Sequence, residues 1–256
     1  MPKIEVKNLS FSYQNGKTEQ RVLDNINLQV NDGEFLCLIG PTGCGKTTFL
    51  RLLSGLERPS SGEIKIDGRS IQNPGPDRMI VFQDCNLFPW LNVLQNVSFA
   101  VRKVRSMKKS EADALAILYL EKLGLKDARN LYPGQLSGGM KQKTAIARAV
   151  ALDSRILLMD EAFSALDEHS RQELQDFLYQ VWLSGGQCKK TIIFVTHNIS
   201  EALLLGERTV LMAGGKIIDE VCPGFRQCGR EVCDKEIFLS LASKLRRELN
   251  DVSAFK

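Results

Sequence analysis

One stretch of eight residues limits the possible folds of this chain more than any other. Gly40–Thr47 reads GPTGCGKT and fits the pattern G-x-x-x-x-G-K-[ST] at every fixed position. The apolar segment 34–40 is typical of a buried strand, and segment 46–56 has helical spacing with a stop near Gly55. A strand, a glycine-rich loop and a helix in this order predict an α/β fold that carries a phosphate-binding loop.

The residue types in this loop suit the phosphates of a nucleotide. Glycines at positions 40, 43 and 45 let backbone N–H groups approach phosphate oxygens without a Cβ in the way. Lys46 is expected to reach the β- and γ-phosphates, and Thr47 to offer its hydroxyl to Mg²⁺. The alternative, a glycine-rich turn that matches the pattern by chance, is disfavoured because the flanking strand and helix are both present.

An acidic pair follows a second buried strand. Segment 155–161 reads RILLMDE, so four apolar residues lead to Asp160 and Glu161. The carboxyl ends of strands in an open α/β sheet meet the ligand, and Asp160 is therefore predicted to hold the Mg²⁺ shell. Glu161 is free to polarise a water for attack on the γ-phosphate. Without the phosphate loop, two solvated acids at a strand end would be an equally good interpretation.

Two further polar residues end strands in the same way. His197 closes segment 190–197, and we expect it to contact the γ-phosphate and hold the attacking water. Gln83 closes segment 78–83 and is within the expected reach of Mg²⁺ or that water. Each residue taken alone would more often be structural. His169, in a polar helix start, is expected to be a surface residue.

A second glycine pair raises a separate question. Leu136–Lys143 reads LSGGMKQK and places serine and two glycines directly before a helical pattern, which is another candidate phosphate cradle. One nucleotide does not need two such cradles from the same chain.

The remaining pattern alternates strands with helices, which predicts a mostly parallel sheet covered on both faces. An antiparallel β subdomain is expected near the start, and a helical subdomain at about 84–150, with Ser110 as the N-cap and Gly124 as the stop of one helix. Strands are predicted at 3–9, 21–30, 34–40, 62–68, 78–83, 155–161, 190–197 and within 208–221, and helices at 46–56, 110–125, 141–152, 170–182, 199–206 and 235–249.

Composition excludes several classes of protein. The net charge of +4 over 256 residues is mild and does not demand a nucleic-acid partner, so none is expected. No apolar run approaches the roughly 20 residues that a membrane span needs, and the first residues lack the apolar core of a secretory signal. A cytosolic location is therefore expected.

The seven cysteines are scattered and include no C-x-x-C pair, so disulfides are not expected. The spacing of Cys222, Cys228 and Cys233, with no histidine nearby, does not favour zinc. Cys44 differs from the others, because a thiol at a helix N-terminus beside Lys46 is expected to be a reactive thiolate. An inert small side chain is the alternative.

Taken in chain order, these motifs resemble the ATP-binding subunits of ABC transporters. Gly40–Thr47 is similar to their Walker A motif and Gln83 to the Q-loop. Leu136–Gly139 resembles the family's LSGG signature, and Ile156–Asp160 its Walker B motif, with Glu161 as the general base. The series closes with SALD at Ser164–Asp167, similar to the D-loop, and His197 as the switch histidine. The resemblance covers about residues 3–221.

The family resemblance implies a dimer and explains the second cradle. ABC ATPase domains work head to tail, and each ATP lies between the P-loop of one domain and the signature of the other. It also implies that Tyr13 stacks on the adenine, whereas the strand pattern alone would favour an inward-packing ring. The implied ATP contacts are Tyr13, Gly40, Pro41, Thr42, Gly43, Cys44, Gly45, Lys46, Thr47, Thr48, Ser137, Gly138 and Gly139. The implied Mg²⁺ ligands are Thr47, Gln83 and Asp160, and the implied catalytic residues are Glu161, His197 and Gln83.

A finer resemblance concerns segment 81–101, which is similar to the region after the Q-loop in importers of the nitrate, sulfonate and taurine group. Leu87–Trp90 forms an apolar LFPW turn, and the family uses this region to receive a membrane permease. Packing within the helical subdomain is the alternative. Met140 replaces the usual glutamine after LSGG, but it lies outside the Ser-Gly-Gly cradle, so function is expected to survive. Ala162 and Glu168 depart from the importer pattern, which weakens the subgroup assignment only.

The resemblance implies an ABC ATPase domain at 1–221 and a short helical tail at 222–256 without a regulatory domain. It implies Mg-ATP hydrolysis that powers solute import, at the cytoplasmic face of the membrane, beside a permease and indirectly a solute-binding protein. One alternative is a soluble ABC ATPase of an assembly system such as iron–sulfur cluster biogenesis. Another is an ATP-binding regulator without turnover, against which Glu161 and His197 argue.

Overall fold

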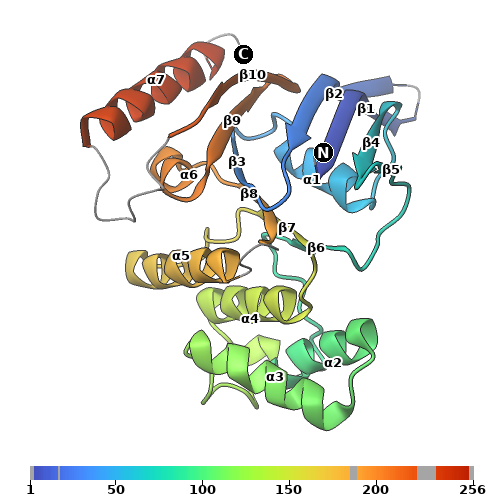
Figure 1. Ribbon diagram of the computed structural model, residues 1–256, viewed down its shortest axis with the longest axis vertical. Helices are drawn as coiled ribbons and strands as arrows, with labels where there is room; N and C mark the ends of the chain where they lie inside the picture. Colours follow the sequence, from blue (N-terminus) through green and yellow to red (C-terminus); the bar gives the residue numbers. More distant parts are fainter. Residues whose placement is uncertain (1–2, 17, 185–188, 224–234, 254–256) are drawn as a thin grey trace. The chain divides into compact units, whose positions relative to one another are not determined.

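A computed structural model of the chain describes all residues except 1–2, 17, 185–188, 224–234 and 254–256. The chain divides into two compact units, which are described separately (Figure 1). Unit 1 comprises residues 1–75 and 191–256, and unit 2 comprises residues 76–190. The phosphate loop therefore belongs to unit 1, and the LSGG segment belongs to unit 2.

The first part of unit 1 is an antiparallel sheet with strand order β2-β1-β4-β5. Ile4 lies at its centre, paired with Val30 on one side and with Ile66 on the other, and all three are buried. Its strands are β1 (Ile4–Asn15), β2 (Thr18–Val30), β4 (Ser61–Ile66) and β5 (Arg69–Ser70). The antiparallel β subdomain expected near the start of the chain is present, and its first two strands are longer than the alternating pattern indicated.

The second part of unit 1 is a largely parallel sheet. Leu38 of β3 pairs in parallel with Val195 of β8 and with Val210 of β9, and β10 pairs antiparallel with β9. Its elements are β3 (Phe35–Ile39), α1 (Lys46–Ser54), β8 (Thr191–Val195), α6 (Ile199–Leu205), β9 (Arg208–Ala213), β10 (Lys216–Val221) and α7 (Lys235–Ser253). Strands β3 and β8 are buried throughout, as their continuous apolar sequences predict.

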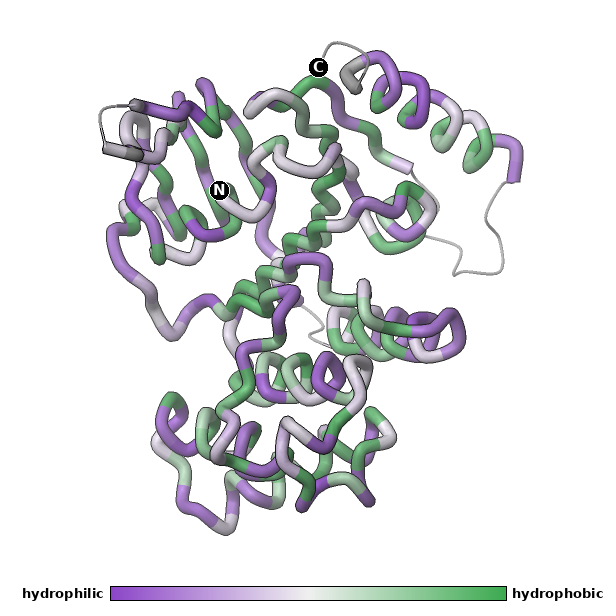
Figure 2. Tube along the Cα trace, turned by 180° about the vertical axis from the view of Figure 1, so that it is seen from behind, coloured by the Kyte–Doolittle hydropathy of each residue, from purple (hydrophilic) through white to green (hydrophobic). Residues whose placement is uncertain are grey.

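The C-terminal helix α7 packs on α6 and β9. Apolar and polar residues alternate along it (Figure 2), with Ala242 and Leu245 buried. Lys244 also forms an ion pair with Asp219 of β10. These contacts attach α7 to unit 1.

Unit 2 combines two parallel strands with four α-helices. Strand β6 pairs in parallel with β7, with Val81 opposite Met159. The elements are β6 (Arg78–Val81), α2 (Val93–Arg105), α3 (Lys109–Lys122), the 3₁₀ turn η1 (Pro133–Gln135), α4 (Gly138–Ala151), β7 (Ile156–Asp160) and α5 (Glu168–Leu183).

The sequence reading of these helices differs from the structure at two points. Segment 93–105 was expected only as part of the helical subdomain, without a helix of its own, although Asn92 and Gln95 form a capping box there: Asn92 Oδ1 accepts from Gln95 N at 2.8 Å, and Gln95 Oε1 accepts from Asn92 N at 3.1 Å. Ser110 is not an N-cap, because α3 already begins at Lys109. The predicted stop is correct, since Gly124 has a φ of 69° just beyond the last turn.

Candidate functional site

The phosphate loop joins the buried strand β3 to α1, as the sequence predicts. Gly45 precedes the helix with φ at 107° and offers no side-chain cap to its first turn. A Cβ on Gly45 would lie 2.6 Å from Leu23 Cδ2, and one on Gly40 would lie 2.2 Å from the Met212 carbonyl oxygen. Larger residues are excluded at both positions, so the loop packs closely against β2 and β9. The start of a helix also favours a bound anion.

Lys46 is held close to the loop. Its side chain is buried, and Nζ donates to the carbonyl oxygens of Gly40 at 2.8 Å and Pro41 at 3.0 Å. Next in sequence, Thr47 lies on the exposed side of the first turn of α1, and Thr48 is buried. The loop thus holds an ammonium group and an exposed hydroxyl one residue apart, the pair that a phosphate–Mg²⁺ group requires.

Cys44 does not match the expectation of a reactive thiolate. Its side chain is 3% exposed, and burial is the largest influence on its pKa, which is raised above the ordinary value for a thiol. Lys46 Nζ, at 3.8 Å from the sulfur, acts in the opposite direction but does not overcome burial. The sequence argument considered the charge and the helix terminus but not the desolvation of the thiol.

His197 follows β8 in unit 1 and is exposed. A buried network fixes the loop that carries it. The Thr196 hydroxyl donates to the Glu201 carboxylate and accepts from Asn198 N at 3.0 Å, and Asn198 Oδ1 accepts from Glu201 N at 3.2 Å as the N-cap of α6. Sequence reasoning missed Thr196 and Glu201. The signal was available in the N-cap asparagine followed three residues later by glutamate.

Tyr13 lies on β1 and is half-buried. Its ring meets Phe11 edge to face, with centroids 4.8 Å apart. Phe11 is buried on the same face of the strand, so Tyr13 is partly covered by the sheet and partly accessible. The structure therefore leaves one part of the ring available for stacking, and its role toward adenine stays a prediction.

Unit 2 brings together the residues that follow β6 and β7. These strands are parallel neighbours, and Gln83 and Glu161 come two residues after the paired Val81 and Met159. Asp160 is 4% exposed at the end of β7. Glu161 is half-buried and has a φ of 47°, a left-handed conformation that is uncommon outside glycine and often found at functional positions.

The signature serine has a structural task in its own subunit. Ser137 is the N-cap of α4, and its Oγ accepts from Met140 N at 3.2 Å, while Ser137 and Gly138 remain exposed. A Cβ on Gly139 would lie 3.1 Å from Leu166 Cδ2. The absence of a side chain at Gly139 therefore permits close packing with segment 164–167. The hydroxyl hydrogen of Ser137 stays available for a ligand.

Two side chains that sequence reasoning missed hold the segment after Gln83. The Arg148 guanidinium, on α4, donates to the carbonyl oxygens of Cys85 at 2.9 Å and Asn86 at 3.0 Å and lies over the Phe88 ring. Burial lowers the pKa of Arg148 from its ordinary value. Asn96 is fully buried and bonds to both backbone groups of Phe88.

The turn that these side chains hold projects an aromatic group. Trp90 is 70% exposed and contacts Phe88, with ring centroids 5.6 Å apart. Packing within the helical subdomain, the alternative for Leu87–Trp90, therefore accounts for Phe88 but not for Trp90. We define this segment, Leu87–Trp90, as the docking turn.

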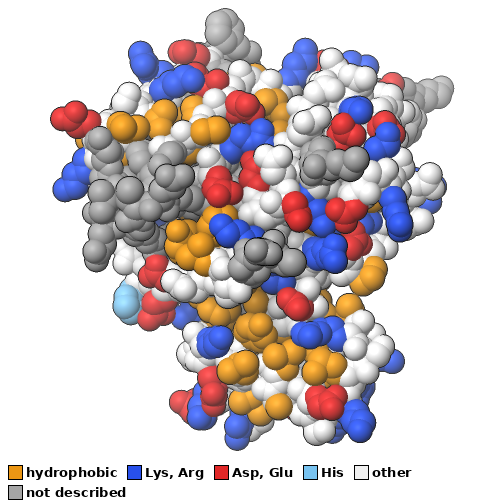
Figure 3. Space-filling view, in the orientation of Figure 1, with side chains coloured by type: hydrophobic (Ala, Val, Ile, Leu, Met, Phe, Trp, Pro, Cys, Tyr) orange, Lys and Arg blue, Asp and Glu red, His pale blue; other side chains and the backbone are white. Residues whose placement is uncertain are grey.

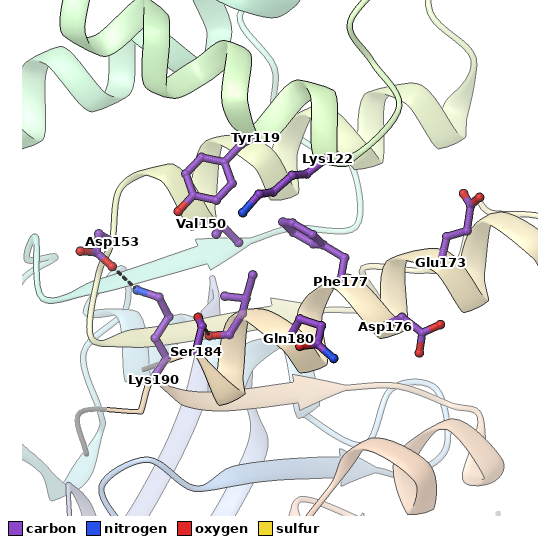
Figure 4. A pocket seen from close by; sticks show the side chains of 11 residues that line it. Tyr119, Lys122, Val150, Asp153, Glu173, Asp176, Phe177, Gln180, Ser184 and Lys190 are labelled. Atoms are coloured by element: carbon purple, nitrogen blue, oxygen red, sulfur yellow. Dashed lines mark hydrogen bonds and ion pairs between the residues drawn. The ribbon is translucent and has the colours of Figure 1, made fainter. Parts of the chain in front are cut away.

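Unit 2 also contains a cavity of about 720 Å³ (Figure 4). Side chains of α3, α4 and α5 line it, including Tyr119 and Phe177, and a 2.7 Å ion pair joins Lys190 to Asp153 at one side. None of the predicted site residues lines this cavity. Its acidic and basic groups do not define a class of ligand.

The remaining sequence expectations concern histidine and cysteine. His169 is exposed, as expected, and lies 3.3 Å from Glu173. Four cysteines in the described part of the chain are free thiols: Cys37, Cys44, Cys85 and Cys222. Cys188, Cys228 and Cys233 lie outside the described residues. Within the described ranges, no group of three or more His, Cys, Asp or Glu side chains could hold a metal ion by itself.

Comparison with known families shows to which family this chain belongs. The model of the ABC transporter family matches residues 23–164, more than half of the chain, and this range includes Gly40–Thr47, Gln83, LSGG and Asp160. The chain belongs to the ABC transporter family. Its α/β fold is that of an ABC cassette, as the order of the motifs predicted.

Several curated ABC proteins are similar to this chain. The bicarbonate transport ATP-binding protein CmpD of Synechocystis is 46% identical over 83% of this chain and 74% of its own length. The nitrate import ATP-binding protein NrtD of Synechococcus elongatus is 44% identical over 75% of this chain and 70% of its own length. A solved dimeric structure of the ATP-binding cassette MJ0796, bound to ADP and Pi, has a TM-score of 0.78 at 32% identity. That match covers 86% of this chain and 98% of the cassette.

Proposed function

We propose that this ABC subunit binds Mg-ATP at Gly40–Thr47 and hydrolyses it to power the import of a solute. The observation that carries the proposal is the phosphate loop itself, with its position at the start of α1, its Lys46 ammonium and the exposed Thr47. The family resemblance implies Thr47, Gln83 and Asp160 as the Mg²⁺ ligands, and their hydroxyl, amide and carboxylate groups offer the oxygen atoms that Mg²⁺ prefers. Bound Mg²⁺ supplies charge neutralisation on the phosphates.

The chain's own residues then carry out distinct tasks. Lys46 binds the β- and γ-phosphates, and in doing so exchanges its bonds to the carbonyl oxygens of Gly40 and Pro41 for phosphate oxygens. Glu161 orients a water and accepts its proton as that water attacks. His197 positions the γ-phosphate and the water, with its loop fixed by Thr196 and Glu201.

Two ATP sites form between two such subunits, each with the P-loop of one and the signature of the other. The exposed Ser137 and Gly138 support this arrangement, because they could contact a nucleotide brought by a second subunit. The similar MJ0796 cassette is described as a dimer with ADP and Pi. The second subunit is an identical copy or a related ABC ATPase.

The complete transporter places this subunit at the cytoplasmic face of a membrane, against a permease, with a solute-binding protein as an indirect partner. None of the described helices is long and apolar enough to cross a membrane. The docking turn, with Trp90 exposed, suits the permease contact. Relatives named for bicarbonate and nitrate favour a small inorganic anion as the solute, and they do not favour an assembly ATPase.

The test is hydrolysis by the purified chain with and without Mg²⁺, followed by uptake in cells that express it with its permease. We expect Mg-dependent release of phosphate by the wild-type chain and its loss in Lys46→Ala. Copurification with iron–sulfur assembly proteins and not with a permease would favour the assembly alternative instead.

A further inference from the structure

Five cations gather within eight residues where α2 ends and α3 begins. We call residues 102–109 the basic tip; its cations are Arg102, Lys103, Arg105, Lys108 and Lys109. All five side chains are exposed, and the segment contains no acid. The whole chain carries a net charge of only +4, so the rest of the molecule is close to neutral. The five cations of the basic tip thus exceed the net charge of the whole chain by one.

The stability of the fold explains only part of this cluster. Arg105 donates to the Ala151 carbonyl oxygen at 3.2 Å, and cations in the last turn of α2 are favoured by the helix dipole. Lys108 and Lys109 are at the N-cap and first position of α3, where the same dipole disfavours cations and where Lys108 supplies no side-chain cap. None of these cations except Arg105 makes a hydrogen bond or ion pair through its side chain with any residue that the structure describes.

Apolar side chains accompany the cations. Val104 is 46% exposed within the basic tip. A groove of about 320 Å³ between α2 and α3, next to the docking turn, is lined by two cations and one acid, Arg102, Lys109 and Asp113, and by apolar side chains that include Leu91 and Leu94. Figure 3 shows hydrophobic side chains bordered by Lys and Arg side chains, with some acidic ones among them, over the region of α2 and α3. Cations with apolar stems beside exposed apolar groups suit the interface of a bilayer.

We propose that the basic tip binds the anionic phospholipid headgroups of the membrane in which the permease lies. The proposal rests on the proposed function only for the presence of a membrane partner. The cations of the basic tip are all exposed, and they are spread over the end of α2, the start of α3 and the residues between them. This arrangement suits many phosphates in a plane. A single free phosphate would instead need converging, buried donors, which the tip does not offer.

The experiment uses the purified full-length chain without permease and follows its flotation with lipid vesicles. Vesicles of phosphatidylcholine alone are compared with vesicles of equal parts phosphatidylcholine and phosphatidylglycerol. We expect binding only to the anionic vesicles, decreasing as the salt concentration rises. ATP hydrolysis is measured separately, so a chain that fails to hydrolyse ATP but binds vesicles would overturn the proposed function and leave this inference standing.

The variant Lys108→Ser/Lys109→Glu separates binding from folding. Serine is a preferred N-cap and glutamate suits the first turn of a helix, so α3 should be as stable as before or more stable. The charge of the chain changes by three units, and partition into anionic vesicles should fall by roughly tenfold or more. The control Arg246→Gln/Arg247→Glu makes the same change in charge at two exposed positions of α7 and should retain binding.

Three results would overturn the proposal. The first is equal binding of the chain to both kinds of vesicle or to neither. The second is equal loss of binding in the tip variant and in the α7 control, which would indicate diffuse attraction by net charge. The third is binding of a single-stranded RNA oligonucleotide that the tip variant alone loses, with no binding to anionic vesicles, which would assign the tip to nucleic acid.

Discussion

At the scale of single residues, Glu161 combines a strand-end position with a left-handed backbone. Replacing it with glutamine keeps the size of the side chain but removes the base. Glu161→Gln should bind ATP and remain as a nucleotide-bound dimer, with hydrolysis reduced by about 10²–10⁴-fold. Steady-state phosphate release by the purified variant is the measurement, and a rate near that of the wild type would reject the role of Glu161 as base.

Cys44 offers a test of how burial lowers the reactivity of a thiol inside the phosphate loop. Because burial raises its pKa, the thiolate is scarce at neutral pH, and labelling by a maleimide should be slow and should increase as the pH rises. The exposed Cys222 should label faster in the same sample. Peptide mapping after brief labelling measures both sites. Faster labelling of Cys44 than of Cys222 at neutral pH would restore the expectation of a reactive thiolate.

At the scale of elements, the buried amide of Asn96 helps to hold the docking turn. Asn96 bonds to Phe88 N at 2.8 Å and to the carbonyl oxygen of Leu91 at 2.8 Å. Asn96→Leu should lower the free energy of unfolding by roughly 1–3 kcal/mol, because buried backbone groups lose their partners. Urea unfolding measures the loss. The control is Ser243→Ala at an exposed position of α7, which should change stability little, and an Asn96→Leu variant as stable as this control would contradict the role of the amide.

Local sequence predicted the elements that depend on periodicity and missed those that depend on tertiary contacts. Strands β3, β7 and β8 were predictable, because continuous apolar runs have few other stable positions. Helix α2 was missed although its capping box was visible in the sequence. Arg148 could not have been assigned, because its partners at Cys85 and Asn86 lie more than sixty residues away along the chain.

In the candidate site, too, some features follow from local sequence and others depend on tertiary contacts. The motifs predict which residues contact ATP, since their chemistry and order are both specific. The network of Thr196 and Glu201 behind His197 and the burial of Cys44 depend on neighbours in space. A pattern of residue types indicates what a side chain can do, whereas its pKa and its mobility depend on the packing around it.

At the scale of the whole molecule, the central claim is that the LSGG segment serves the nucleotide of a second subunit. Lys46→Ala removes the P-loop charge, and Ser137→Arg crowds the signature. Each pure variant forms dimers with two damaged sites. A mixed dimer instead contains one site that is doubly damaged and one that has an intact Lys46 and an intact Ser137.

The measurement is the amount of ATP retained after gel filtration by pure and mixed dimers, with Glu161→Gln in every chain so that bound ATP is trapped. Tagged copies of each variant show that mixed dimers form. We predict that the mixture retains ATP at about one site per mixed dimer, while each pure variant retains almost none. Equally negligible retention by the mixture and by both pure variants would contradict the arrangement in trans.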